Sequence, residues 1–223
     1  MAMTLEQLEA EVQGLREQVA GLREQVAQAA HTGDYLEIWK LQSLYSHLYY
    51  IGRRSEIPGL FAQKTPGVTL EMEDSGVYEG LESVTRFWNT VLDAGKIGAG
   101  HLAIHMTVNP IIEIDRERTR AKALWHSHGY CSLPMGASLK QFLCLGKYDM
   151  EYVKEDGQWK ILKFAYHQAF MCPYEQGWVQ EPVAASIAGS PDNRPDKPTT
   201  SYMPYSQYRI NVMQPPPPEP YAE

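Results

Sequence analysis

Cysteine is scarce in this sequence, and the three cysteines form no recognisable pattern. Cys131, Cys144 and Cys172 are odd in number, and no two of them have CxxC spacing. This argues against a disulfide framework or a zinc knuckle and favours a reducing, cytoplasmic location. Long apolar runs are also missing, because none approaches the ~18 residues of a membrane span and the first residues form no signal-peptide core. We therefore expect no membrane partner.

Positive charge is in short supply as well. The chain has 20 Lys and Arg against 27 Asp and Glu, which gives a formal net charge of -7. Because the phosphate backbone of a nucleic acid attracts a basic surface, this balance argues against a nucleic-acid partner. GxSxG, GxGxxG and GxxxxGK[ST] are all absent, so nothing predicts a nucleophilic serine or a nucleotide site. A small, weakly charged ligand fits the composition better, and we predict no cofactor.

The clearest pattern that is present is a heptad repeat in the first 30 residues. Apolar residues follow each other at alternating spacings of three and four: Leu5, Leu8, Val12, Leu15, Val19, Leu22 and Val26. Such a seam is typical of a coiled coil, and its two positions per heptad are narrow for a helix that packs on a core. We therefore predict an oligomerisation arm at 1–30 that forms a homodimer or homotrimer. The alternative is an amphipathic helix that packs on its own domain.

The segment 31–172 has the pattern of one α+β domain. His31 to Asp34 predict a break, after which Asp34 caps a second helix from Tyr35 to about Ile51. Further elements are expected as follows: a short helix at Ser55–Ala62, a strand at Val68–Met72, a turn at Tyr78–Gly80 and a helix at Leu81–Leu92.

Beyond residue 100 the apolar period changes to two, which predicts strands at 101–114, 119–133, 139–154 and 158–170. Pro110 predicts a bulge or bend in the first of these strands. Helices followed by long antiparallel strands indicate a cone-shaped, curved antiparallel sheet that is wrapped by the N-terminal helices. The tail at 173–223 is rich in Pro and Tyr, and it is expected to be either disordered or an extended strap over this domain or a neighbouring subunit.

Five of the seven histidines fall in or beside the predicted strands: His101, His105, His126, His128 and His167. Alternation places the first two on one face of their strand, and the HxH pair on one face of the next strand. Neutral imidazole suits a general base near neutral pH. The alternatives are an ordinary core role for each histidine, or a metal site at the HxH pair.

Local strings carry a family resemblance over roughly 35–170. They are HMTVNPIIEID at 105–115, AKALW at 121–125, DGQWKIL at 156–162, and Tyr45 with Phe61-Ala62. With this order of elements, the chain resembles the SnoaL-like branch of the nuclear-transport-factor-2-like superfamily. That fold hosts hydratases, isomerases, cyclases, decarboxylases and binding proteins.

Within that family, the Tyr45 and His105 regions are similar to those of bile-acid 7α-dehydratases. This likeness implies a catalytic tyrosine at Tyr45 and a catalytic histidine at His105. Three positions depart from the dehydratase pattern, because Tyr50 and Gly129 replace acids and Gln168 replaces an arginine. The tail at 195–221 is similar to those of lyases that release formaldehyde from lignin-derived diarylpropane diols.

The resemblance therefore implies a cofactor-independent lyase that acts on a small, largely apolar aromatic alcohol by loss of formaldehyde or of water. His105 would be the base and Tyr45 the hydrogen-bond donor, while His126 or His128 would move a second proton. The expected substrate-binding residues are Tyr50, His101, Asn109, Trp125, His167 and Gln168. The alternatives are a non-catalytic ligand-binding or assembly module, a steroid dehydratase or isomerase, and a metal enzyme that uses the HxH pair.

Overall fold

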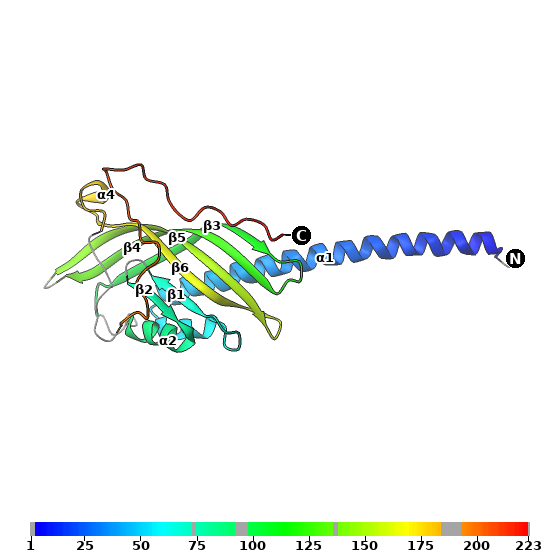
Figure 1. The fold of residues 1–223 in the computed structure, drawn as a ribbon, viewed down its shortest axis with the longest axis horizontal. Coiled ribbons are helices and arrows are strands. Elements are labelled where there is room, and N and C mark those ends of the chain that lie inside the picture. Colours follow the sequence, from blue (N-terminus) through cyan, green and yellow to red (C-terminus); the bar gives the residue numbers. More distant parts are fainter. Residues whose placement is uncertain (1–2, 73–74, 92–97, 136–137, 184–192, 223) are drawn as a thin grey trace.

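The computed structural model describes residues 3–72, 75–91, 98–135, 138–183 and 193–222. A single long helix is followed by a curved six-stranded sheet, and the C-terminal tail runs back along that sheet (Figure 1). The expected α+β class, with a curved sheet and an N-terminal helix, is thus confirmed. No helix in the described ranges is both long and apolar enough to cross a membrane.

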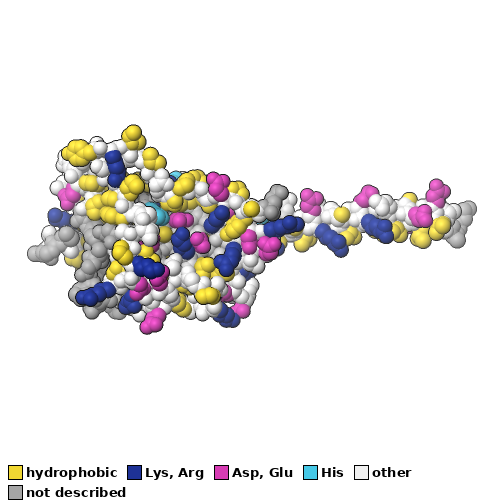
Figure 2. All heavy atoms as spheres, viewed as in Figure 1, with side chains coloured by type: hydrophobic (Ala, Val, Ile, Leu, Met, Phe, Trp, Pro, Cys, Tyr) yellow, Lys and Arg dark blue, Asp and Glu magenta, His cyan; other side chains and the backbone are white. Residues whose placement is uncertain are grey.

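Helix α1 runs from Leu5 to Tyr50 and has two different environments. Thr4 caps its start, because the Thr4 side chain accepts from the Gln7 amide while the Gln7 side chain accepts from the Thr4 amide. The first half of α1 extends beyond the domain as an arm, along which hydrophobic side chains recur (Figures 1 and 2). The second half buries Asp34, Ile38, Gln42, Tyr45 and Leu48, which lie on one stripe at spacings of three and four.

The predicted break at residues 31–34 is wrong, because α1 is continuous there. Asp34 does not cap a helix but turns its buried carboxylate towards the sheet. That carboxylate accepts hydrogen bonds from Arg118 (2.5 Å), from the Trp159 indole (3.0 Å) and from Lys154. These long-range contacts outweigh the roughly 1 kcal/mol by which Gly33 disfavours a helix.

Short elements connect α1 to the main sheet. The 3-10 helix η1 spans Arg54–Leu60, where a short helix was expected, and strand β1 spans Thr69–Met72. The turn predicted at Tyr78–Gly80 is wrong: strand β2 spans Gly76–Glu79, and helix α2 begins directly after it and spans Gly80–Thr90. The predicted end of that helix at Leu92 lies outside the described residues.

Four long strands build most of the sheet: β3 (Leu102–Ile114), β4 (Arg120–Met135), β5 (Ser138–Glu155) and β6 (Gln158–Pro173). Each extends within a few residues of its predicted range, and the order in space is β2-β1-β6-β5-β4-β3. Neighbouring strands are antiparallel except for β1 and β6, which pair in parallel. The expected irregularity at Pro110 is confirmed, because the β3–β4 register shifts between Val108 and Ile111.

The described part of the C-terminal tail is an ordered strap over its own domain. After the short helix α4 (Gly177–Gln180), residues 196 and 197 bond to Val77 of β2, and the Tyr205 amide donates to the Ala169 carbonyl of β6. The Lys147 ammonium of β5 donates to the carbonyls of Met213 (3.0 Å) and Pro215 (3.1 Å). The tail therefore crosses the outer face of the sheet, while α1 and α2 cover the inner face (Figure 1).

Candidate functional site

A cavity of about 260 Å³ lies between the inner face of the sheet and the helices. Helices α1 and α2 supply one side of its lining, and β3, β4, β5 and β6 supply the other. The lining is mainly apolar and aromatic, with a small set of polar groups: Tyr45, Tyr49, Arg54, His101, His105, Cys131, Tyr148 and Tyr166. Among the described residues that line it there is no carboxylate. An apolar pocket with a few convergent polar groups is typical of a small-molecule site.

Tyr45 enters this cavity from the buried stripe of α1. Its ring packs edge-on against Phe164 at 5.0 Å and against Tyr148 at 5.6 Å. The Tyr45 and Tyr148 hydroxyls lie 3.2 Å apart and share a hydrogen bond. Burial raises the pKa of Tyr45 well above its ordinary value, and the neighbouring Tyr148 adds to this shift. Tyr45 therefore stays a neutral phenol that can donate a proton or a hydrogen bond.

His105 comes from β3 and is positioned by two tyrosine rings. The Tyr49 ring meets the imidazole edge-on at 5.1 Å, and the Tyr166 ring does so at 6.0 Å. The His105 carbonyl accepts a hydrogen bond of 2.6 Å from the Ser46 hydroxyl, which ties β3 to α1. Nδ1 of His105 is buried and has no hydrogen-bond partner within the described residues. The imidazole is thus held in place while one nitrogen is left without a bond.

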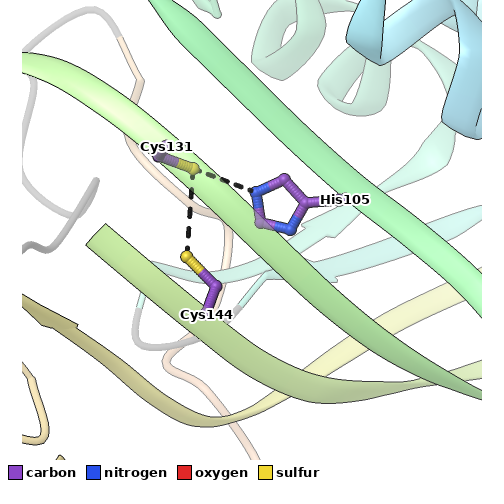
Figure 3. A group of neighbouring side chains, drawn as sticks. All are labelled: His105, Cys131 and Cys144. Carbon is purple, nitrogen blue, oxygen red and sulfur yellow. Dashed lines mark hydrogen bonds between the residues drawn. The ribbon is translucent and has the colours of Figure 1, made fainter. Parts of the chain in front are cut away.

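Two cysteines lie beside His105 (Figure 3). Cys131 Sγ of β4 is 3.8 Å from His105 Nε2 and 3.9 Å from Cys144 Sγ of β5. Both cysteines are buried, and neither forms a disulfide. The contact with Cys144 lowers the pKa of Cys131, burial opposes that change, and His105 reinforces the lowering. Cys131 is therefore unusually acidic for a buried thiol.

His101 and Arg54 form a second polar pair in the cavity. Arg54 Nη2 lies 3.1 Å from His101 Nε2, and the buried guanidinium stacks over the Tyr49 ring at 4.5 Å. Burial lowers the pKa of His101, and the positive charge of Arg54 lowers it further. His101 is therefore neutral beside a fixed cation, and this end of the cavity favours a ligand oxygen that carries negative charge.

The structure does not bring His126 and His128 into this cavity. His105 pairs with Gly129 across β3 and β4, so odd-numbered residues of this part of β4 share the inner face with His105. His126 is exposed and His128 is half-buried on the opposite face. The expectation that these two histidines lie with Tyr45 and His105 is wrong. It requires even-numbered residues of β4 on the inner face, and the pairing register places them on the outer face.

Three further predicted site residues also lie away from the cavity lining. Trp125 is fully buried, but its indole donates to Tyr152 at 3.1 Å within the core. Tyr50 is half-exposed at the end of α1, and Asn109 is exposed in the β3 bulge with a positive φ of 50°. Of the expected substrate-binding residues, only His101 therefore lines the inner cavity.

His167 and Gln168 line a different cavity of about 250 Å³, which lies between the outer face of the sheet and the tail. His167 Nδ1 is 3.0 Å from the Ser201 hydroxyl of the tail. Burial lowers the pKa of His167 despite the nearby Asp149 and Glu71 carboxylates. Described residues thus line a cavity on each face of the sheet.

Several groups of the inner cavity were not predicted from the sequence, among them Arg54, Cys131 and Tyr166. Alternation along β4 gives Cys131 the same face as Gly129, but only the strand register shows that Gly129 is the partner of His105. Arg54 had no such signal, because it lies in a short irregular helix whose orientation depends on the rest of the fold.

Comparison with known proteins agrees with this architecture. The profile of the SnoaL-like domain family matches residues 30–165. No curated protein matches the sequence.

Several solved structures share the fold at low sequence identity. A hexachlorocyclohexane dehydrochlorinase (LinA) type 2 has a TM-score of 0.54 and 19% identity, covering 72% of this chain and 95% of its own. LinA type 3 from Novosphingobium barchaimii has a TM-score of 0.52 and 18% identity, with coverages of 72% and 97%. The Kfla4162 protein from Kribbella flavida has a TM-score of 0.51 and 19% identity, with coverages of 64% and 95%. The profile match spans more than half of the chain, which belongs to the SnoaL-like domain family.

Proposed function

We propose that this protein is a lyase that removes water or formaldehyde from a small, largely apolar aromatic alcohol, using proton transfer by its own side chains. The observation that carries this proposal is the placement of His105 and Tyr45 in one apolar cavity. One group can accept a proton and the other is a neutral donor. Acid–base groups positioned in this way contribute roughly 10²- to 10⁴-fold in rate each.

For loss of water, His105 takes a proton from carbon, and the electron pair of that bond forms the double bond. The hydroxyl leaves as water with a proton from the Tyr45 phenol, which regains a proton from His105. Tyr45 hydrogen-bonds the departing oxygen. The Tyr148 hydroxyl, 3.2 Å from that of Tyr45, supports the phenol as its charge changes. Two similar structures are named as dehydrochlorinases, and dehydrochlorination is also an elimination.

For loss of formaldehyde, His105 takes the proton of a CH₂OH group. The carbon–carbon bond to that group breaks and formaldehyde leaves. The released electron pair forms the new double bond while a second hydroxyl departs as water, so one diol yields one alkene, one formaldehyde and one water. Arg54 supports this route, because its buried guanidinium can stabilise negative charge that develops on a substrate oxygen.

A carboxylate-based isomerase is less well supported. That chemistry needs a buried carboxylate base, and the described lining of the inner cavity contains no Asp or Glu. The size of the cavity favours a small ligand, because about 260 Å³ lies just below the roughly 300–1,000 Å³ of typical ligand pockets.

The test is product analysis by mass spectrometry after incubation of chelator-treated protein with aryl-propane diols and hydroxysteroids. We expect loss of water or formaldehyde that falls at least about 100-fold in His105→Ala. His126→Ala is the matched control, because it removes the same side chain from the outer face, and it should retain activity. Equal loss in both variants would contradict the proposed site. Binding without conversion of any compound would favour a ligand-binding module.

A further inference from the structure

His105, Cys131 and Cys144 gather one imidazole nitrogen and two thiols at a single point of the inner face (Figure 3). Their ligand atoms all lie within 4.8 Å of one another. We propose that these three residues form a Zn²⁺ site, with the fourth coordination position open to the cavity. The inference does not depend on the proposed lyase activity, since it concerns what the cluster binds.

The spacing of the donor atoms fits tetrahedral zinc. With Zn–S near 2.3 Å and Zn–N near 2.1 Å, tetrahedral angles place two sulfurs about 3.8 Å apart and sulfur and nitrogen about 3.6 Å apart. Cys131 Sγ lies 3.9 Å from Cys144 Sγ and 3.8 Å from His105 Nε2. The third separation, between Cys144 Sγ and the His105 nitrogen, is within 4.8 Å and must shorten by up to about 1.2 Å for the three atoms to surround one ion.

The sheet makes room for the cluster through a glycine. His105, Gly129 and Cys144 lie side by side across β3, β4 and β5. A Cβ at Gly129 would lie 2.6 Å from the Ile104 carbonyl, 3.1 Å from His105 Nδ1 and 3.3 Å from Cys144 Cβ. Glycine thus lets the two outer side chains converge over the middle strand, where Cys131 lies two residues further along.

Charge and burial also suit zinc. Two thiolates neutralise the double charge of the ion, so the loaded centre is neutral and can lie among apolar side chains. Its surroundings are apolar, because Ala103, Phe142 and Met171 pack with the two cysteines. Thiolate and imidazole donors together favour zinc over the hard cations Mg²⁺ and Ca²⁺.

Zinc at this site would change the role of His105. The imidazole uses the Nε2 lone pair to bind the ion, and Nδ1 then carries the proton, so the ring can no longer accept a proton from a substrate. Cys131 and His105 line the cavity, whereas Cys144 is not among its lining residues. The open position therefore faces the space where a substrate would lie, and bound zinc should block proton transfer by His105.

The direct test is metal binding by the full chain after chelator treatment under reducing conditions. We expect one Zn²⁺ per chain by mass spectrometry of the metal, and competition with a chromophoric chelator should give its affinity. Cys131→Ser, Cys144→Ser and His105→Ala should each weaken binding at least about 10-fold. Cys172→Ser is the matched control, because Cys172 is equally buried but lies outside the cluster, and it should bind zinc as the unmutated chain does.

Cobalt provides a second readout that needs no variant. Co²⁺ in the unmutated chain should give tetrahedral d–d bands and a thiolate-to-cobalt charge-transfer band of the intensity of two thiolates. Three results would each overturn the site. They are less than stoichiometric metal binding, a cobalt spectrum without thiolate bands, and a loss of zinc affinity in Cys172→Ser equal to that in the cluster variants. Substrate conversion without any metal binding would refute the zinc site and support the proposed lyase activity. Zinc binding without conversion would support the zinc site and refute the lyase activity.

Discussion

The hydroxyl of Tyr45, on the N-terminal helix, lies 3.2 Å from the hydroxyl of Tyr148, on the fifth strand, and both line the inner cavity. This contact joins the helical and sheet sides of the candidate site. It also gives the Tyr45 phenol a partner that can hydrogen-bond to its oxygen when the Tyr45 proton is shared with a substrate. The two groups therefore provide a direct test of the proposed chemistry.

Replacing Tyr45 by Phe should lower kcat about 10- to 100-fold, because it removes one hydrogen bond to the departing oxygen and leaves the ring in place. The measurement is steady-state kinetics on whichever diol or hydroxysteroid is converted. Tyr35→Phe is the control, because Tyr35 lies on the same helix outside the cavity lining. An unchanged kcat in Tyr45→Phe would show that the phenol takes no part in the reaction.

Asp34→Asn should destabilise the fold at neutral pH. The carboxylate accepts from Arg118, Lys154 and Trp159, and its loss leaves two cations without their partner. Since Arg118 is partly exposed, we expect a loss of about 2–3 kcal/mol in the free energy of unfolding, measured by urea denaturation at pH 7. Asp156→Asn, at an exposed ion pair with Lys64, is the control and should have little effect.

The same variant should alter how stability depends on pH. Burial opposes ionisation of Asp34, but its hydrogen bonds to Arg118, Lys154 and Trp159 outweigh burial and hold its pKa below the ordinary value. A depressed folded-state pKa contributes stability above the unfolded-state pKa of about 3.9, and that contribution is lost as the pH falls through the lower folded value. The difference in the free energy of unfolding between Asp34→Asn and the unmutated chain should therefore become smaller below about pH 4. A difference that stays constant down to pH 2 would contradict this account.

Gly33→Ala should stabilise the protein by about 1 kcal/mol in urea denaturation. Gly33 lies within a continuous helix, its φ is not positive, and a Cβ there would meet no atom within 4 Å. Had the chain broken at this point, as its sequence suggests, alanine would bring no such gain. A loss of stability on this change would therefore argue for an interrupted helix.

The arm should control self-association. Its seam residues are 40% to 73% exposed in the single chain, and an exposed heptad seam favours pairing with another copy. Leu15→Glu together with Leu22→Glu should convert a dimer or trimer to monomers in light scattering. Gln13→Glu together with Ala20→Glu is the control, because it adds the same charge outside the seam. This variant should keep the oligomeric state of the unmutated chain. A monomeric unmutated chain would refute the prediction.

The sequence by itself determined the elements whose signal is local. The helical arm, the four long strands and the bulge at Pro110 follow from periodicity and from the missing amide of proline, and each is present. Local strings also sufficed to predict the family, because all of them lie within residues 30–165, which the family profile matches. The same strings single out Tyr45 and His105, and both residues line the inner cavity.

Tertiary structure decided what depends on partners far along the chain. Asp34 is a residue type that often caps helices, yet it lies inside a helix. Its carboxylate is held there by contacts with Lys154 and Trp159 of two strands and with Arg118 of a hairpin turn. His126 and His128 have side chains that suit acid–base catalysis, yet the strand register places them on the outer face. A register shift of one residue would have placed them on the inner face. Cys131 and Cys144 join His105 only because three strands align over Gly129. Composition and spacing do not encode which residues meet across a sheet; pairing register and packing do.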